Sequence, residues 1–152
     1  MPELDDPRPA AIGEHLRLDE MPPEEAAACL EELRRLIQAK DNPNLRPLGH
    51  ELVDARSLAL HRVIADHLVQ DPQLVPAARR RVEKLLAEGH MHPVYAKAWL
   101  ELLDGPRDRL LEVLCDPGER ATALRQCTPF VGVLKQSTRL RILREVREGK
   151  IA

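Results

Sequence analysis

Prolines and glycines interrupt this 152-residue chain at helix-length intervals, and between them apolar residues recur every three to four positions. Such spacing places the apolar side chains on one face of a helix. No stretch alternates apolar and polar residues for long enough to predict a sheet. The sequence therefore predicts an all-α fold, a single bundle-like domain of six or seven helices over residues 21–152, preceded by a loose, flexible arm at residues 1–20.

The predicted helices begin and end at residues that favour helix ends. Asp71 is a predicted N-cap with Pro72 at the first helical position, Asp116 and Glu119 have the spacing of a capping box, and Ser137 is expected to cap the last helix. Gly89 is expected to end a helix in the left-handed conformation. The expected helices span residues 21–40, 48–69, 71–89, 93–105, 106–115, 116–124 and 137–149.

Only three residues are aromatic, so Leu, Val, Ile and Ala must supply most of the core. We expect the 48–69 helix to be central and to be covered on two sides, because its apolar residues form more than one stripe. Pro129 and Gly132 predict a non-helical connector at residues 127–134. The other side chains expected to face inward are Leu30, Leu33 and Ile37; Val75, Ala78, Val82, Leu85 and Leu86; Tyr95, Ala98, Trp99, Leu102 and Leu103; Phe130, Val131 and Val133; and Leu140, Leu143 and Val146.

The net charge of −2 is unevenly distributed. Residues 1–70 carry 8 basic and 14 acidic residues, whereas residues 71–152 carry 15 basic and 11 acidic residues.

No apolar run is as long as a membrane span, and the N-terminus has no basic start or apolar middle like those of a signal peptide. We therefore expect a cytoplasmic protein without a membrane partner. Cys29, Cys115 and Cys127 are expected to be reduced and mostly buried.

Residues 89–106 are a candidate for a metal or catalytic site, because His90 and His92 lie close to Tyr95 and Trp99 in the sequence. Zinc needs three or four converging ligands, and Cys115 and Cys127 match no zinc spacing with these histidines. His61 and His67 project from different sides of one helix. No Gly-rich phosphate loop or calcium loop occurs, and no general base lies near a nucleophile in the sequence. We therefore predict no catalytic residue, no metal site and no cofactor.

The charge distribution instead favours a non-catalytic protein-binding module. The predicted partner-binding residues belong to the acidic N-terminal region and the arginine-bearing last helix. These residues are Asp5, Asp6, Arg139, Arg141, Arg144 and Arg147. Head-to-tail self-association into a homo-oligomer would use the same charges. The alternative is a DNA-binding transcriptional regulator that contacts phosphates through the basic C-terminal helix, although three aromatic residues leave little for base stacking.

Two segments, HPVYAKAWLELLDGPRDRLLEVLCDP and ALRQCTPFVGVLKQSTRLRILREVR, resemble the antitoxin partners of bacterial toxin–antitoxin operons over residues 89–147. The resemblance implies a helical bacterial protein that neutralises a toxic partner enzyme and in some cases represses its own operon. Many antitoxins join a DNA-binding domain to a disordered tail that wraps the toxin. Here the candidate arm is N-terminal and no helix-turn-helix can be recognised, so no individual functional residue is carried over.

Overall fold

The computed structural model describes residues 18–39 and 49–150. These residues form seven α-helices and one 3-10 turn and contain no strand, which confirms the predicted all-α fold. Of the predicted arm at residues 1–20, only the turn at its end lies within the described residues. The elements are η1 (Leu18–Glu20), α2 (Pro23–Gln38), α3 (His50–Gln70), α4 (Leu74–Ala87), α5 (Pro93–Asp104), α6 (Arg107–Cys115), α7 (Glu119–Gln126) and α8 (Gln136–Arg147).

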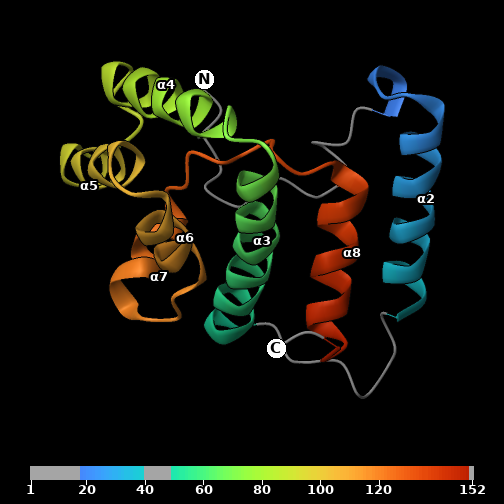
Figure 1. Cartoon of the computed structure of the whole chain (residues 1–152). Helices are drawn as coiled ribbons and strands as arrows, with labels where there is room; N and C mark the ends of the chain where they lie inside the picture. Colours follow the sequence, from blue (N-terminus) through green and yellow to red (C-terminus); the bar gives the residue numbers. More distant parts are fainter. Residues whose placement is uncertain (1–17, 40–48, 151–152) are drawn as a thin grey trace, which may run out of the picture.

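Helix α3 occupies the centre of the molecule, as its broad apolar surface predicted (Figure 1). The α6 and α7 helices pack against one side of α3, and α8 packs against another side. Helix α2 lies on the far flank of α8, while α4 and α5 form a pair at the opposite end of the molecule. Among the described helices, none combines the length and the apolar character needed to cross a membrane.

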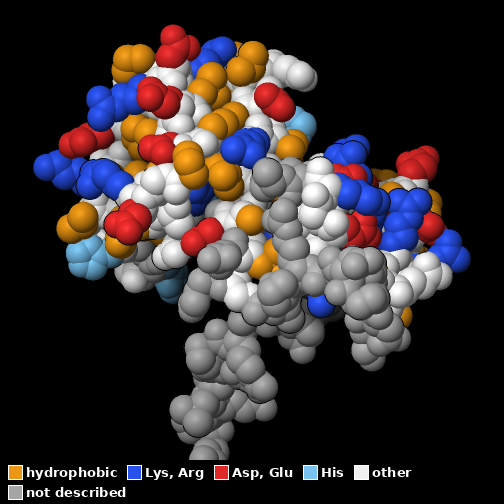
Figure 2. Space-filling model, turned by 90° about the horizontal axis from the view of Figure 1, so that it is seen from below, with side chains coloured by type: hydrophobic (Ala, Val, Ile, Leu, Met, Phe, Trp, Pro, Cys, Tyr) orange, Lys and Arg blue, Asp and Glu red, His pale blue; other side chains and the backbone are white. Residues whose placement is uncertain are grey.

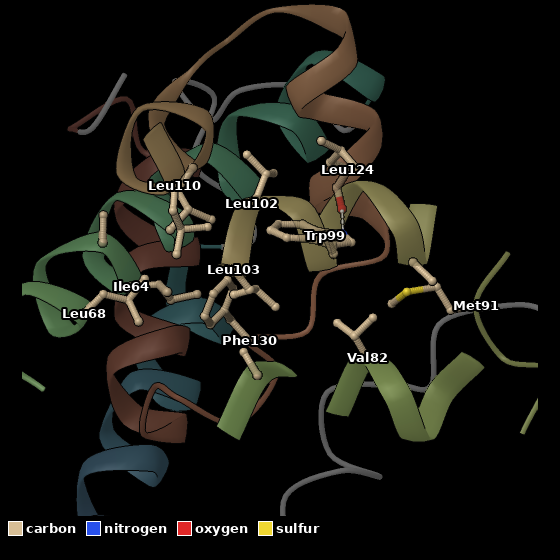
Figure 3. Close-up of a cluster of buried hydrophobic side chains, with 14 residues drawn as sticks. Ile64, Leu68, Val82, Met91, Trp99, Leu102, Leu103, Leu110, Leu124 and Phe130 are labelled. Carbon is tan, nitrogen blue, oxygen red and sulfur yellow. Dashed lines mark hydrogen bonds between the residues drawn. The ribbon is translucent and has the colours of Figure 1, made fainter. Parts of the chain in front are cut away.

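The main core contains side chains from each of the helices α3, α4, α5, α6 and α7. These side chains pack around Trp99, whose side chain has no exposed surface (Figure 3). The indole N–H of Trp99 donates a hydrogen bond to the carbonyl oxygen of Leu124 at 3.2 Å, so its one polar group is satisfied. Phe130 from the connector packs edge-on against Trp99, with ring centroids 5.9 Å apart. The predicted roles of Trp99 and Phe130 as core residues are confirmed.

A second, smaller apolar cluster joins α3 to α8. Leu52 and Ala59 of α3 are buried with Ile142 and Val146 of α8. Because the start of α3 meets the end of α8, the two helices run antiparallel (Figure 1). Helix α2 contributes no buried residue to this cluster.

Four helix ends were predicted from named capping residues. The structure agrees with one of these predictions and differs from the other three. Gly89 has a φ of +74°, as predicted, and the N–H of His90 bonds the Leu85 carbonyl in a C-terminal cap. Asp71 and Asp116 each accept a backbone N–H two residues on, in turns that precede the next helix, so neither is an N-cap. Ser137 lies inside α8 rather than at its N-cap, which is Lys135.

Several side chains that were expected to face inward are exposed. Leu30 and Ile37 of α2 are 53% and 71% exposed, because α2 turns a different face, with Cys29 and Glu32, toward α8. Tyr95 is 39% exposed, and Leu86 and Val131 are exposed as well. Periodicity identifies an apolar stripe, but only the packing decides whether a neighbour covers it.

Candidate functional site: a groove between α3 and α8

The predicted partner-binding arginines belong to α8, which lies between α3 and α2 (Figure 1). This placement separates them into exposed and buried residues. Arg139 and Arg141 are exposed, Arg147 is half-buried and Arg144 is buried. The predicted acidic contacts, Asp5 and Asp6, lie outside the described residues.

Arg144 is engaged within the protein. Its Nε donates to Glu32 Oε2 of α2 at 2.8 Å, and its Nη1 donates to Glu148 Oε2 at 3.1 Å. The hydrogen bond with Glu32 raises the pKa of the Arg144 guanidinium above its ordinary value. Only 7% of Arg144 is exposed, so in this arrangement it joins α2 to α8 and offers no cation to an outside partner.

A groove of about 470 Å³ lies between α3 and α8 and is also lined by α7 and the connector that contains Phe130. Among the described residues its lining contains arginines but no Asp or Glu. The lining consists of Val53, Arg56, Ser57, Leu60, His61, Ile64, Arg125, Gln126, Thr128, Phe130, Val131, Gly132, Leu134, Arg139 and Leu143. The groove therefore combines an apolar floor with positive charge.

Arg56 is the cation of this groove that the sequence analysis missed. It is half-buried on α3, and its Nε is buried without a hydrogen-bond partner. Burial, and secondarily the nearby charge of Arg147, lower the pKa of Arg56. The signal that could have found it is its position within the apolar pattern, since Val53 and Leu60 lie three residues before it and four residues after it.

Arg147 of α8 is also half-buried, although it is not part of the groove lining. Its Nε is also buried without a hydrogen-bond partner, and its charge acts on Arg56. Within the described residues neither Arg56 nor Arg147 forms an ion pair. Among the described residues, two half-buried cations therefore act on each other without an ion-pair partner, although buried charges in proteins are normally paired.

Arg125 lines the groove but directs its guanidinium elsewhere. Its terminal nitrogens donate to the carbonyl oxygens of Val113 and Asp116 and to the hydroxyl of Thr122. The first two acceptors lie at the C-terminal end of α6, where a cation is favourable. Arg125 is therefore a structural cap of α6, and Arg56 and Arg139 carry the accessible charge of the groove.

His61 lies at the inner side of the groove, and both of its ring nitrogens are engaged. Nδ1 is 2.7 Å from the carbonyl oxygen of Ser57, and Nε2 is 2.9 Å from Thr128 Oγ1. Because a carbonyl only accepts, Nδ1 carries the proton and Nε2 accepts from the hydroxyl. Burial lowers the pKa of His61 to about 4, so the ring is neutral at pH 7 and joins α3 to the connector.

His90 and His92 have separate surroundings. Nδ1 of His92 accepts the N–H of Val94 at 3.1 Å and makes His92 the N-cap of α5. His90 is exposed beside Glu88. In residues 18–39 and 49–150, no three His, Cys, Asp or Glu side chains are grouped as metal ligands would be.

Basic side chains gather on one part of the surface. Figure 2 shows lysine and arginine side chains gathered where Figure 1 places α2 and α8, with some acidic side chains among them. The rest of the face in Figure 2 mixes both charges with apolar side chains.

No protein-family model matches the chain, and no curated protein or solved structure is significantly similar to it.

Proposed function

We propose that the protein is a non-catalytic binding module that holds an acidic partner protein in the groove between α3 and α8. The observation that carries this proposal is the lining of the groove. Arg56 and Arg139 lie there beside apolar side chains, and the described residues of the lining include no Asp or Glu. A partner that presents carboxylates beside apolar side chains matches that lining in both charge and polarity.

The chemistry of the groove supports binding over catalysis. His61 is the one histidine in the lining, and it has no free nitrogen with which to accept a proton from a substrate. The pKa of its imidazole, about 4, also lies far from neutral pH, where a general base would be effective. The remaining polar groups of the lining are suited to hydrogen bonding.

The specific form of this proposal is an antitoxin-like neutraliser, in which the acidic partner is a toxic enzyme. Its test is co-expression with the product of the neighbouring gene. The wild-type protein should restore growth that the neighbouring gene product inhibits, and the Arg139→Glu variant should not. A neighbouring gene whose product is harmless would contradict the antitoxin role and leave the binding proposal standing.

The alternative of DNA binding uses the same arginines in a different way. Arg139 and Arg141 are exposed on α8, which α2 and α3 flank, and exposed guanidinium groups can contact phosphates. A duplex of about 20 base pairs tested at low and high salt distinguishes the two functions. Salt-dependent binding that is lost in Arg139→Glu and Arg141→Glu would favour the regulator.

The main experiment is affinity capture from the native host with three forms of the protein. Arg139→Glu reverses the charge of one residue in the groove lining, and Arg81→Glu makes the same change at an exposed position of α4. We expect a partner that the wild type and Arg81→Glu retain equally and that Arg139→Glu loses. A partner retained equally by all three forms would show that the groove is not the binding site.

A further inference from the structure

Helix α2 lies at the edge of the molecule and turns one face away from α8 (Figure 1). Leu30 and Ile37 on this face are 53% and 71% exposed, and Ala27 and Arg34 are exposed beside them. These four residues are spaced three, four and three positions apart, so they follow one side of the helix with the a and d spacing of a coiled coil. We call them the α2 stripe.

The charges of α2 are distributed along the helix in a way that favours a second copy of the same helix. The acidic residues Glu24 and Glu31 border the stripe, and Arg34 lies within it on the C-terminal side of both. In a parallel pair of α2 helices the two Arg34 side chains would meet, whereas an antiparallel pair brings Arg34 of each copy beside Glu31 of the other. Charge complementarity therefore favours antiparallel self-pairing.

We propose that the protein forms a symmetric homodimer in which the α2 stripes of two copies pack against each other antiparallel. The register that joins Arg34 of one copy to Glu31 of the other also places Ala27 opposite Ile37, a small side chain against a large one, and buries Leu30. Because the same surface serves both copies, this contact is symmetric, unlike the head-to-tail association expected from the sequence.

The dimer and the groove use different surfaces. Helix α8 separates α2 from α3, so the outer face of α2 lies away from the groove between α3 and α8 (Figure 1). Dimerisation through the α2 stripe leaves both grooves open and gives one assembly two of them. The homodimer therefore does not depend on the proposed function of the groove.

The length of α2 determines the expected strength of the dimer. A helix of 16 residues is about 24 Å long, so one helix pair makes a contact at the small end of specific interfaces, below about 1,200 Å². The exposed ion pairs of Glu31 with Arg34 and Arg35 within one chain are weak and do not prevent Glu31 from contacting the other copy. We expect a dimer dissociation constant on the order of 10 μM.

The first test is sedimentation of the full chain over a range of about 1 to 300 μM, which spans that dissociation constant. The wild type should change from monomer to dimer, and Ile37→Glu, which places a carboxylate in the stripe, should remain monomeric. Val94→Glu makes a similar change at a 66% exposed position of α5 and should dimerise like the wild type. A monomeric wild type, or a dimer that both variants form equally or both lose, would overturn the proposal.

The second test separates contacts between chains from contacts within one helix. Glu31→Arg and Arg34→Glu each give a chain with like charges at the two positions, so each alone should dimerise at least about tenfold more weakly than the wild type. An equimolar mixture should recover a heterodimer, because the two chains then present opposite charges to each other. A mixture that associates no more tightly than either variant alone would contradict the antiparallel contact.

The homodimer and the binding module fail in different ways. A chain that stays monomeric and loses a captured protein through Ile37→Glu would show that the stripe binds a different protein, and the homodimer would be eliminated. A dimer with the predicted response to these variants, in a protein that captures no partner at the groove, would support the homodimer and contradict the proposed function.

Discussion

Trp99 lies in a cluster of apolar side chains from α3 to α7, whereas the contact between α2 and α8 contains a buried carboxylate and a buried guanidinium. In the first region the Trp99 indole and the Cys127 thiol donate side-chain hydrogen bonds to the Leu124 carbonyl, and apolar side chains pack around them. In the second region the Glu32–Arg144 pair occupies the centre of the contact. We refer to the two regions as the Trp99 core and the α2–α8 contact.

The α2–α8 contact also includes an N-terminal cap that comes from another helix. Glu25 of α2 accepts the backbone N–H of Ser137 at 2.8 Å and its hydroxyl at 2.9 Å. The backbone N–H of Ser137 is the main reason that the pKa of Glu25 lies below its ordinary value. A carboxylate is favourable at this end of α8 because unpaired N–H groups and the helix dipole concentrate positive charge there.

The comparison teaches that α2 and the Trp99 core are attached by different physical means. Apolar burial is non-directional and cumulative, so no single directional contact holds the Trp99 core together. A few directional contacts hold α2, and the apolar residues Leu30 and Ile37 on its other face remain exposed. We therefore expect α2 to separate from α8 at a lower free energy than the Trp99 core unfolds.

The largest effect is expected in the Trp99 core. Phe130→Ala removes a buried ring that packs against Trp99, and such truncations cost about 3–5 kcal/mol. Urea unfolding followed by Trp99 fluorescence measures the loss. Val131→Ala, at the exposed neighbouring position, is the matched control, and an equal effect of both substitutions would contradict the assignment of Phe130 to the core.

Acid should weaken the Trp99 side of the molecule before it weakens the α2–α8 contact. The pKa of His61 is about 4 in the folded protein, against 6.5 for an ordinary histidine, so between these values only the unfolded chain binds the proton. The free energy of unfolding should therefore fall by on the order of 3 kcal/mol as the pH drops through this window.

Urea titrations between pH 7 and pH 4 check this prediction, and His61→Gln should flatten the profile. Glu25 loses its contribution to stability at a lower pH than His61 does, because its folded pKa is depressed. The contribution of Glu25 is present above its ordinary pKa of 4.5 and is lost only as the pH falls through the lower folded value. Release of α2 at pH 6, ahead of any change around Trp99, would contradict this order.

Breaking the buried ion pair should release α2 without unfolding the Trp99 core. Glu32→Gln leaves Arg144 with Glu148 as its remaining acidic partner, so we expect a cost of about 2 kcal/mol, or roughly 30-fold faster amide exchange in α2. Exchange in α5 should be unchanged. Replacing both partners, as Glu32→Leu with Arg144→Met, should restore protection in α2, since buried ion pairs can be exchanged for apolar pairs.

The smallest effect is expected at an exposed ion pair. Arg79 Nε donates to Asp104 Oδ1 at 2.8 Å and links α4 to α5 at the surface. Exposed pairs contribute little because water and salt screen them, so the melting temperature of Asp104→Asn should match that of the wild type. A decrease in the melting temperature of Asp104→Asn as large as that of Glu32→Gln would contradict the distinction between buried and exposed polar contacts.

Local chemistry made part of the fold predictable. Gly89 was identified as a left-handed helix end because the residue type alone favours that conformation. Trp99 was identified as a core residue because a large ring on an apolar stripe is rarely left in water. These inferences depended only on the residue and its near neighbours in the sequence.

The residues that were misplaced depend on distant neighbours. Ser137 was expected to cap α8, but Glu25 from α2 bonds both its N–H and its hydroxyl. Arg144 was expected to meet an outside partner, but Glu32 pairs with it inside the protein. Both acidic residues come from a helix more than one hundred residues away in the chain, and no local pattern encodes that proximity.

The groove shows the same limit. Arg139 was recognised from its basic helix, whereas Arg56 became a candidate only when α3 and α8 were placed side by side. The predicted protein partner and the predicted antitoxin role remain predictions, because they concern a molecule outside the chain.

The amino-acid sequence by itself determined that this protein is built of helices, where most of them lie and that Trp99 is buried, because helix ends and apolar periodicity are local properties. Only the tertiary structure decided which polar groups are paired. A charge is compensated or left open according to what packs against it in space, and that neighbour distinguishes Arg144, held by Glu32, from Arg56, which faces the groove with no described acid beside it.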